Sequence, residues 1–311
     1  MGISDRTPGA PDGATIGVDV GGTKCLGILW SDGAVVAEAR RTTPQDPMEM
    51  IGAVTDVIEE LSGPLSSPVP IGLGMPGLVT RRGVVRASPN LPEVVELPVG
   101  DLVGSRLGRA VFVDNDATCA AVAEWRAGAG RGTDDMVLVT LGTGIGAGIV
   151  AGGSVIRGTQ GFAGEIGHMV VDPDGPPCPC GQRGCWERYA SGSALAARAV
   201  EMSGVGHPWT GEDLARSALD GDQRALGIFR DFARWLARGL ANITNIFDPD
   251  VIVVGGGVAR EAALFIDDAR ADLADFVYAS QRRNLPRILV AEWDERAGAV
   301  GAALLAAADL A

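Results

Sequence analysis

Hydrophobic residues along the chain follow two different spacings. Short runs rich in valine and isoleucine, each closed by glycine, proline or a polar turn, predict β-strands. Longer segments in which apolar residues recur every three or four positions predict helices. The predicted strands are 14–20, 25–30, 34–40, 69–75, 109–115, 135–142, 144–153, 250–257 and 287–292. The predicted helices are 46–61, 117–128, 222–247, 261–277 and 297–309.

One arrangement of elements occurs twice. The segments "IGVDVGGTKCLGILW" and "MVLVTLGTGIGAGIV" each read as a strand, a glycine-rich turn and a second strand. This repetition predicts two related α/β domains with a cleft between them, and small ligands usually bind in such clefts. The expected division is a disordered tail over 1–14, an N-terminal domain of 15–116 plus 297–311, and a C-terminal domain of 117–296 that contains a loop at 168–187.

Glycine-rich turns follow three of the predicted strands, in "DVGGTK" (19–24), "LGTGIGAG" (141–148) and "VVGGGV" (253–258). Glycine lets backbone N–H groups point together and lets a phosphate approach them closely. The Walker A spacing is absent, and a strand rather than a helix follows "GTGIGAG", which argues against a Rossmann fingerprint. Either of the first two turns alone could be a tight hairpin in which glycine only relieves strain. Three such turns together favour a nucleotide held across a cleft, with Asp19 placed to hold Mg²⁺, usually through water.

Acidic and amide side chains follow the strand that ends at "VFVDNDA", where Asp114, Asn115 and Asp116 precede a predicted helix. One interpretation is helix capping, because Asp and Asn are favoured N-cap residues. The other is a general base that takes a proton from an alcohol, which is what phosphoryl transfer requires besides positioning and charge stabilisation.

The composition excludes several classes of protein. The chain has 311 residues, 46% of them hydrophobic, which is ample for two domains with a core. The net charge of −13 argues against a nucleic-acid surface. No apolar run reaches the roughly 18–20 residues that span a bilayer, and the first fifteen residues lack the apolar core of a signal peptide. We therefore expect a cytoplasmic protein with no membrane or nucleic-acid partner.

Three of the five cysteines fall within "CPCGQRGC", and a histidine precedes them in "GEIGHM". His168, Cys178, Cys180 and Cys185 would supply one nitrogen and three sulfurs, the closed tetrahedral set of a structural zinc site. A disulfide or free buried thiols remain alternatives. Metal is favoured because the cysteine count is odd, no export signal is present, and a loop rich in proline and glycine needs a crosslink.

Taken together, "DVGGTK", "VDNDA", "LGTGIGAG", "GEIGHM" and "CPCGQRGCWE" resemble the ROK family of repressors and sugar kinases, and within it most the bacterial glucokinases. The motifs, with "VVGGGV", span most of the chain. The resemblance implies an actin-like ATPase fold of the ribonuclease H-like type, with ATP, Mg²⁺, structural Zn²⁺ and a sugar in the cleft.

The resemblance also implies roles for individual residues. Asp116 would be the base that deprotonates the sugar 6-hydroxyl. His168 would hold zinc with one ring nitrogen and sugar with the other. The implied hexose-binding set is Gly77, Asn90, Asn115, Asp116, Glu165, His168 and Glu187. The implied ATP contacts are Asp19, Gly21, Gly22, Thr23, Lys24, Gly142, Thr143, Gly144, Gly256 and Gly257.

The activity expected from the resemblance is an ATP-dependent glucokinase of glycolysis, with glucose and ATP as substrates and a homodimer or homotetramer as the assembly. Kinases of N-acetylmannosamine, N-acetylglucosamine or fructose are alternatives, and polyphosphate could replace ATP as donor. Two further alternatives are a sugar-sensing regulator without turnover, which would need no base at Asp116, and a zinc-loop interaction module in which the glycine turns are incidental.

Overall fold

The computed structural model describes residues 13–203 and 208–308, so most of the predicted tail, residues 1–12, lies outside it. Two compact units are present. The first unit comprises Met1–Arg131, Val155–Ala163 and Glu295–Ala311, and the second comprises Gly132–Ser154 and Gly164–Asp294.

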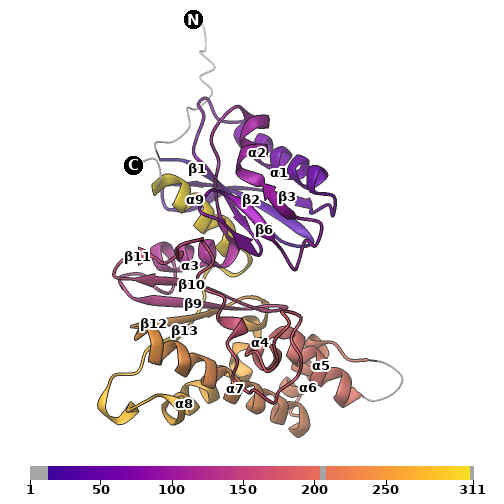
Figure 1. The fold of residues 1–311 in the computed structure, drawn as a ribbon, viewed down its shortest axis with the longest axis vertical. Coiled ribbons are helices and arrows are strands. Elements are labelled where there is room, and N and C mark those ends of the chain that lie inside the picture. Colours follow the sequence, from indigo (N-terminus) through magenta and orange to yellow (C-terminus); the bar gives the residue numbers. More distant parts are fainter. Residues whose placement is uncertain (1–12, 204–207, 309–311) are drawn as a thin grey trace, which may run out of the picture. The chain divides into compact units, whose positions relative to one another are not determined.

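The first unit is built on a five-stranded sheet in the order β3-β2-β1-β4-β8. Figure 1 labels β1, β2 and β3 of this sheet. β1 pairs with β2 and β2 with β3 in antiparallel fashion, whereas β1, β4 and β8 run parallel. The predicted strands of this half are therefore confirmed. Their bounds are β1 (Thr15–Val20), β2 (Lys24–Ser31), β3 (Ala34–Thr42), β4 (Ile71–Met75) and β8 (Phe112–Asn115).

Glycines in the strands let helices pack directly on both faces of this sheet. A Cβ at Gly17 in β1 or Gly72 in β4 would overlap backbone carbonyls of α9 (Ala297–Ala308). A Cβ at Gly27 in β2 would overlap Val57 of α1 (Pro47–Ser62). Gly27 is the cross-strand partner of Val18 rather than of Gly17, so α1 and α9 cover opposite faces.

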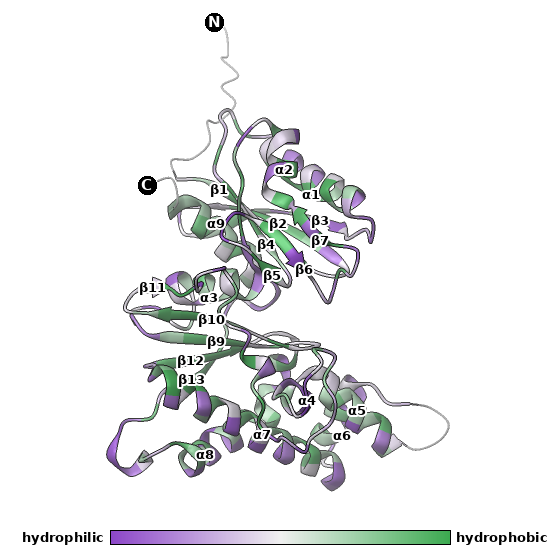
Figure 2. Ribbon diagram, viewed as in Figure 1, coloured by the Kyte–Doolittle hydropathy of each residue, from purple (hydrophilic) through white to green (hydrophobic). Residues whose placement is uncertain are grey.

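The second unit repeats this topology in the order β11-β10-β9-β12-β13. β9 and β10 form an antiparallel hairpin, and β9, β12 and β13 run parallel. Both β9 and β10 are coloured as hydrophobic in Figure 2, as expected for strands buried by helices. The repetition predicted from the two glycine-containing hairpins is thus confirmed. The bounds are β9 (Met136–Leu141), β10 (Ile145–Ala151), β11 (Ser154–Val155), β12 (Val251–Gly255) and β13 (Arg287–Val290).

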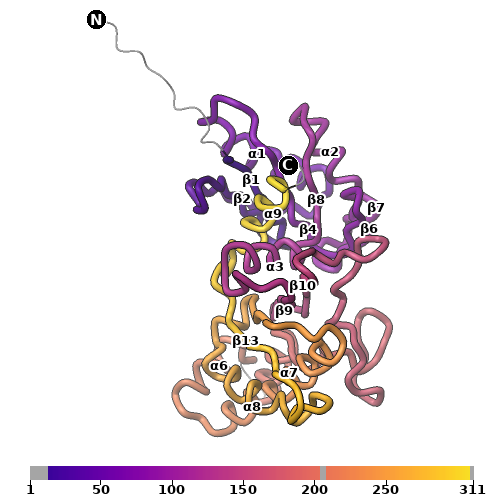
Figure 3. The backbone as a smooth tube through the Cα atoms, turned by 90° about the vertical axis from the view of Figure 1, so that its left-hand side faces the viewer, coloured from indigo at the N-terminus to yellow at the C-terminus, as the bar shows by residue number. Residues whose placement is uncertain are grey.

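The longest helix, α7 (Gln223–Phe247), forms much of the core of the second unit. Asp222 caps it by accepting hydrogen bonds from the backbone N–H groups of Arg224 and Ala225. It packs beside α8 (Ile266–Phe276), as Figure 3 shows. The other helices of this unit are α4 (Glu187–Ala190), α5 (Gly192–Ser203) and α6 (Gly211–Leu219), with short 3-10 helices η1 (Ile166–His168), η2 (Gly257–Leu264) and η3 (Ser280–Arg282). A fourth, η4 (Asp294–Arg296), spans the change of unit.

Some elements differ from the predictions. The predicted helix 261–277 is interrupted, because η2 ends before Phe265, whose φ of −146° is not helical. A three-stranded antiparallel sheet of β5 (Leu78–Val79), β6 (Val84–Ala87) and β7 (Val95–Pro98), followed by α2 (Val99–Leu107), was not predicted. Strands of two to four residues are too short for a period of two to stand out.

The compact units also divide differently from the predicted domains. Helix α3 (Asp116–Ala127), expected in the C-terminal domain, belongs to the first unit. It packs on α9 so closely that a Cβ at Gly301 would overlap the carbonyl oxygen of Cys119. Residues 155–163 belong to the first unit as well. In the described part of the chain, no helix has the length and apolar character needed to span a bilayer.

Candidate active site and metal centre

Two carboxylates lie together at the carboxyl edge of the first sheet. Asp19 is near the end of β1, and Asp116 begins α3 directly after β8. Because β1, β4 and β8 are parallel, their ends meet at one edge, with Gly74 of β4 between the two acids. A Cβ there would lie 3.4 Å from Asp19 Oδ1 and 3.5 Å from Asp116 Cα. Burial, and then the charge of Asp116, raise the pKa of Asp19 to about 7, against the opposing effect of Lys24.

The Asp116 carboxylate is held by the start of its own helix. Its Oδ1 accepts hydrogen bonds from Ala117 N at 2.8 Å and from Asn115 Nδ2 at 3.0 Å. Asn115 is the N-cap of α3, since its Oδ1 accepts from Thr118 N at 3.0 Å. Helix capping is therefore a role of Asn115 rather than of Asp116, and the general-base role of Asp116 stays a prediction.

Asn90 and Gly77, two of the predicted sugar-binding residues, lie at the same edge of the first unit. Asn115 Nδ2 also donates to the carbonyl oxygen of Gly77 at 3.1 Å. Gly77 has φ of 94°, a left-handed conformation that glycine adopts without strain. Asn90 contacts the first glycine turn, where a Cβ at Gly22 would lie 3.0 Å from Asn90 O. The first unit thus brings these residues together with both carboxylates.

The first glycine turn joins β1 to β2 and is held from outside by Thr43. Thr43 Oγ1 donates to Gly21 O at 2.8 Å, and Thr43 N donates to Thr23 O at 3.0 Å. Lys24, at the end of the turn, forms an ion pair with Glu295. Hydrogen bonds from Lys24 and Arg40 lower the pKa of Glu295 to about 2. The ammonium group of Lys24 would therefore have to exchange this carboxylate for a phosphate in order to bind ATP.

The other glycine turns converge at the carboxyl edge of the second sheet. Gly192, which begins α5, donates its N–H to Gly142 O at 2.7 Å, and Ser193 N donates to Thr143 O at 3.4 Å. Gly256, with φ of 83°, comes directly after β12. It lies so close to the end of β9 that an added Cβ would be 2.5 Å from Leu141 O. A Cβ at Gly142 or Gly257 would meet nothing within 4 Å, which leaves room for a ligand to approach the backbone there.

Glu187 ties the cysteine loop to the second glycine turn. Its Oε2 accepts a hydrogen bond from Ile145 N at 2.9 Å. A Cβ at Gly144 would overlap the same oxygen, so only glycine permits this approach. The link was not predicted, because residues 144 and 187 stand in separate motifs and no local pattern joins them.

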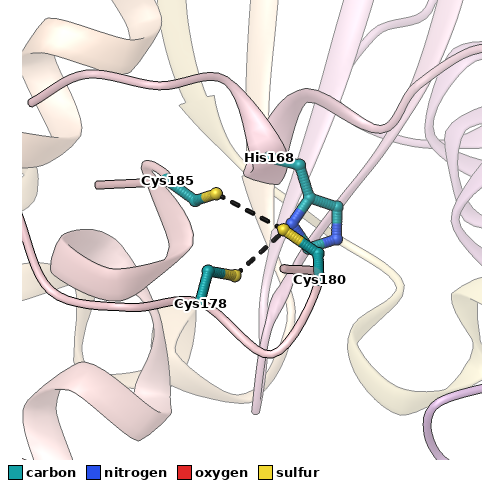
Figure 4. A group of neighbouring side chains, drawn as sticks. All are labelled: His168, Cys178, Cys180 and Cys185. Carbon is teal, nitrogen blue, oxygen red and sulfur yellow. Dashed lines mark hydrogen bonds between the residues drawn. The ribbon is translucent and has the colours of Figure 1, made fainter. Parts of the chain in front are cut away.

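His168, Cys178, Cys180 and Cys185 come together as predicted, with all four ligand atoms within 4.8 Å of one another (Figure 4). His168 Nδ1 lies 3.8 Å from Cys178 Sγ, and the sulfurs of Cys180 and Cys185 are 3.6 Å apart. Ligands on a tetrahedral zinc ion with bonds of about 2.0–2.3 Å lie roughly 3.5–3.8 Å apart. The donor set therefore fits zinc. A disulfide would need about 2.05 Å between sulfurs, and all five cysteines are free.

The backbone shapes the cysteine loop as a short hairpin. Cys178 N donates to Gln182 O at 2.8 Å, and Gly184 N donates to Pro176 O at 2.9 Å. Cys178 and Cys185 are buried, whereas Cys180 is exposed. Few apolar side chains support such a hairpin, so a metal ion bound by its cysteines would supply the missing crosslink.

The imidazole of His168 points one nitrogen at the cysteines and the other at a carboxylate. Nδ1 is on the Cys178 side, and Nε2 lies 4.0 Å from Glu165 Oε2. Desolvation and the nearby Glu187 carboxylate raise the pKa of Glu165, while His168 opposes them. The three predicted sugar-binding side chains of the second unit are thus neighbours, with Nδ1 of His168 facing the metal ligands.

Trp186, between Cys185 and Glu187, also shapes this site although it was not singled out from the sequence. Its indole is fully buried, and Nε1 donates to Trp235 O of α7 at 2.8 Å. The signal that could have found it is a large apolar residue inside an otherwise polar, proline- and glycine-rich loop.

Comparisons with known proteins identify the family of this chain. The model of the ROK family matches residues 15–309. The chain belongs to the ROK family. Among relatives, the glucokinase of Streptomyces coelicolor is 36% identical over 94% of this ROK chain and 98% of its own length. The glucokinase of Thermotoga maritima is 35% identical over 85% of this chain and 88% of its own.

A solved structure of the ROK family has the same fold. It is a ROK glucokinase from Streptomyces griseus in complex with glucose and AMPPNP, with a TM-score of 0.82 and 37% identity. The match covers 94% of this chain and 98% of that one. The expected actin-like ATPase fold of two α/β domains is confirmed.

Proposed function

We propose that this chain is an ATP-dependent glucokinase that transfers the γ-phosphoryl group of ATP to the 6-hydroxyl of glucose. The observation that carries the proposal is the pair of carboxylates, Asp19 and Asp116, at one sheet edge of a ROK family protein. The glucokinase relatives support glucose as the sugar and ATP as the donor.

Asp116 is the proposed general base. Hydrogen bonds from Ala117 N and Asn115 Nδ2 orient its carboxylate, so that it can accept the proton of the 6-hydroxyl as that oxygen attacks phosphorus. Asp19 is the carboxylate proposed to hold Mg²⁺ through a water molecule. Bound Mg²⁺ supplies charge neutralisation at the transferred phosphoryl group. The raised pKa of Asp19 fits this role, because a cation would stabilise a carboxylate charge that burial, and then the charge of Asp116, disfavour.

The groups proposed to bind the sugar are polar. In the first unit they are Asn90, Asn115 and the backbone of Gly77. In the second unit they are Glu165, His168 and Glu187. The amide and carboxylate groups offer both donors and acceptors, which is what hydroxyl recognition requires.

The glycine turns would cradle the phosphates through backbone N–H groups. Gly21–Lys24 and Gly142–Gly144 supply the two turns, and Gly256 and Gly257 would lie near the adenosine. The zinc is structural in this proposal, since four protein ligands leave no open position on a tetrahedral ion. It would keep His168 and Glu187 in place.

The substitution Asp116→Asn tests the base. Glucose binding, measured by calorimetry, should stay within a few-fold, while phosphorylation should fall by at least about three orders of magnitude. Asp101→Asn, which removes an exposed carboxylate of α2 in the same unit, is the matched control and should keep full activity. Turnover retained by Asp116→Asn would rule out the base assignment.

A phosphorylation panel tests the substrate. Glucose, N-acetylmannosamine, N-acetylglucosamine and fructose are each assayed with ATP and with polyphosphate. The proposal expects the highest kcat/KM for glucose with ATP. A higher value for another pair would reassign the substrate, and sugar binding without any product would indicate a regulator. The proposed homodimer or homotetramer is measured separately by light scattering.

A further inference from the structure

A cavity of about 440 Å³ lies within the first unit, and the proposed reaction does not use it. Its walls are the residues of and before β8, the turn between β5 and β6, and part of the segment 155–163. The volume falls within the range of roughly 300–1,000 Å³ typical of small-molecule sites.

Three arginines line this cavity: Arg81, Arg82 and Arg157. Arg81 and Arg82 are the two central residues of a β-turn, which is closed by a hydrogen bond of 2.9 Å from Gly83 N to Thr80 O. Neither forms an ion pair with a carboxylate in the described part of the chain. Two adjacent arginines without an acid are unexpected in a chain of net charge −13.

Arg157 is held at the cavity by Asp114, the only carboxylate among the lining residues that the structure describes. Its Nε donates to Asp114 Oδ2 at 2.7 Å, and the Asp114 side chain is 7% exposed. The terminal nitrogens of Arg157 have no protein acceptor among the described residues. Three guanidinium charges and one carboxylate charge leave two positive charges at the cavity. That surplus matches a phosphate dianion better than a single carboxylate.

The walls that carry the arginines are fixed to each other. Arg81 Nε donates to Gly158 O at 2.9 Å, which joins the β-turn to the segment that contains Arg157. Gly161, with φ of 103°, approaches Val79 so closely that a Cβ would overlap its carbonyl oxygen. Arg81 and the segment that carries Arg157 are therefore preorganised, which favours affinity because less side-chain and loop ordering is needed on binding.

We propose that this cavity is an anion site, in which Arg81, Arg82 and Arg157 bind the phosphate group of a small molecule or inorganic phosphate itself. The site is independent of the proposed ATP contacts, none of which lines the cavity.

The site also has a route to the proposed sugar-binding residues. Asp114 binds Arg157 with Oδ2 and accepts the backbone N–H of Asn115 with Oδ1 at 2.9 Å. A phosphate that attracts the Arg157 guanidinium would therefore change the position of Asp114. Asn115, whose amide donates to Asp116, would be displaced with it. This coupling rests on the proposed function, whereas binding at the cavity does not.

Calorimetry on the full chain tests the binding. Glucose and Mg·AMPPNP are present at saturation, so that the proposed active site is occupied. Orthophosphate and glycerol 3-phosphate are titrated separately. The proposal expects one further binding event, weakened at least about tenfold in the variant Arg81→Gln/Arg82→Gln. The control Arg86→Gln/Arg106→Gln removes the same charge from exposed positions of the first unit and should leave affinity unchanged.

The two probes distinguish the sources of phosphate. Binding of both would mean that phosphate alone suffices, and binding of glycerol 3-phosphate only would mean that the organic part is recognised; each supports the site. No binding of either up to roughly 10 mM, or equal weakening in the control variant, would overturn it. Arg81→Gln removes the hydrogen bond to Gly158 O, so the single variant Arg82→Gln is measured as well. Arg82 is exposed, so its replacement alone should leave thermal unfolding unchanged and still weaken binding, which separates loss of a binding group from loosening of the cavity walls.

A second measurement tests the coupling. Saturating glycerol 3-phosphate should change the KM for glucose at least about twofold in the wild type and leave it unchanged in Arg81→Gln/Arg82→Gln. An unchanged KM with confirmed binding would exclude the route through Asp114 while leaving the anion site in place. If the wild type showed no kinase activity even without glycerol 3-phosphate, that result would instead contradict the proposed function.

Discussion

The indole ring of Trp186 fills the space that a side chain at Gly239 would occupy. A Cβ at Gly239 would overlap three atoms of the ring, and the indole Nε1–H bonds to the carbonyl oxygen of Trp235 on the same helix, α7. Trp186 stands between Cys185, a proposed zinc ligand, and Glu187, a proposed sugar ligand. One buried side chain thus connects the loop of proposed zinc ligands, and the proposed sugar-binding residue that follows it, to the longest helix of the second unit.

We expect Gly239→Ala to displace Trp186, because close-packed interiors accommodate an added methyl group poorly. The free energy of unfolding should fall by about 1–3 kcal/mol, and the KM for glucose should rise more than kcat falls, since Glu187 moves with the ring. Chemical denaturation and steady-state kinetics measure the two effects.

Gly227→Ala is the matched control, since it makes the same change in the same helix where a Cβ would meet nothing within 4 Å. It should stabilise the protein by about 0.5–1 kcal/mol through helix propensity and leave KM unchanged. Equal behaviour of the two variants would show that the fit of Trp186 against α7 does not position Glu187.

Metal analysis should find about one zinc per chain, because the His168 and cysteine donors fit a tetrahedral ion. Cys180→Ser should remove it, and since Cys180 is exposed, little packing is lost with the thiol. The expected consequence is weaker glucose binding with mainly local unfolding, seen as a change in tryptophan fluorescence.

Cys25→Ser is the control for the zinc experiment. Cys25 lies in β2, outside the cluster, with Thr43 Oγ1 at 3.4 Å from its sulfur, so its replacement should keep the zinc. A fully active protein without zinc would contradict the crosslinking role proposed for the metal.

Asn115 caps α3 with its side-chain oxygen and donates a hydrogen bond to Asp116 with its amide nitrogen, and substitutions can separate these two roles. Serine is as good an N-cap as asparagine but lacks the amide that donates to Asp116 and Gly77. Asn115→Ser should therefore keep the free energy of unfolding within about 0.5 kcal/mol and lower kcat, whereas Asn115→Ala should lower both stability, by about 1 kcal/mol, and kcat. Denaturation curves and steady-state kinetics of both variants measure the change in stability and the change in kcat separately. If Asn115→Ser keeps the wild-type kcat, the amide does not orient the base.

The sequence predicted what local patterns can encode. The short β-branched runs of β1 and β9 and the glycines after them indicated two related α/β domains, and the spacing from His168 to Cys185 indicated the cluster that the fold brings together. Contacts between distant segments could not be read this way. Trp186 meets Trp235, and Arg157 meets Asp114, across more than forty positions. Only the three-dimensional packing brings these residues next to the candidate site.

The charge on Asp19 should make the magnesium-free protein less stable as pH rises. The folded-state pKa is raised from 3.8 to about 7, so the protonated form is favoured by folding. This contribution is complete below the unfolded-state pKa and is lost as pH passes through the folded-state value. Between pH 5 and 8 the wild type should lose at most about 3 kcal/mol relative to Asp19→Asn. Asp116→Asn should show a smaller loss, because it removes the like charge, and added Mg²⁺ should restore stability at pH 8. Denaturation curves at several pH values measure these differences, and parallel curves for the wild type and Asp19→Asn would show that Asp19 is ionised throughout.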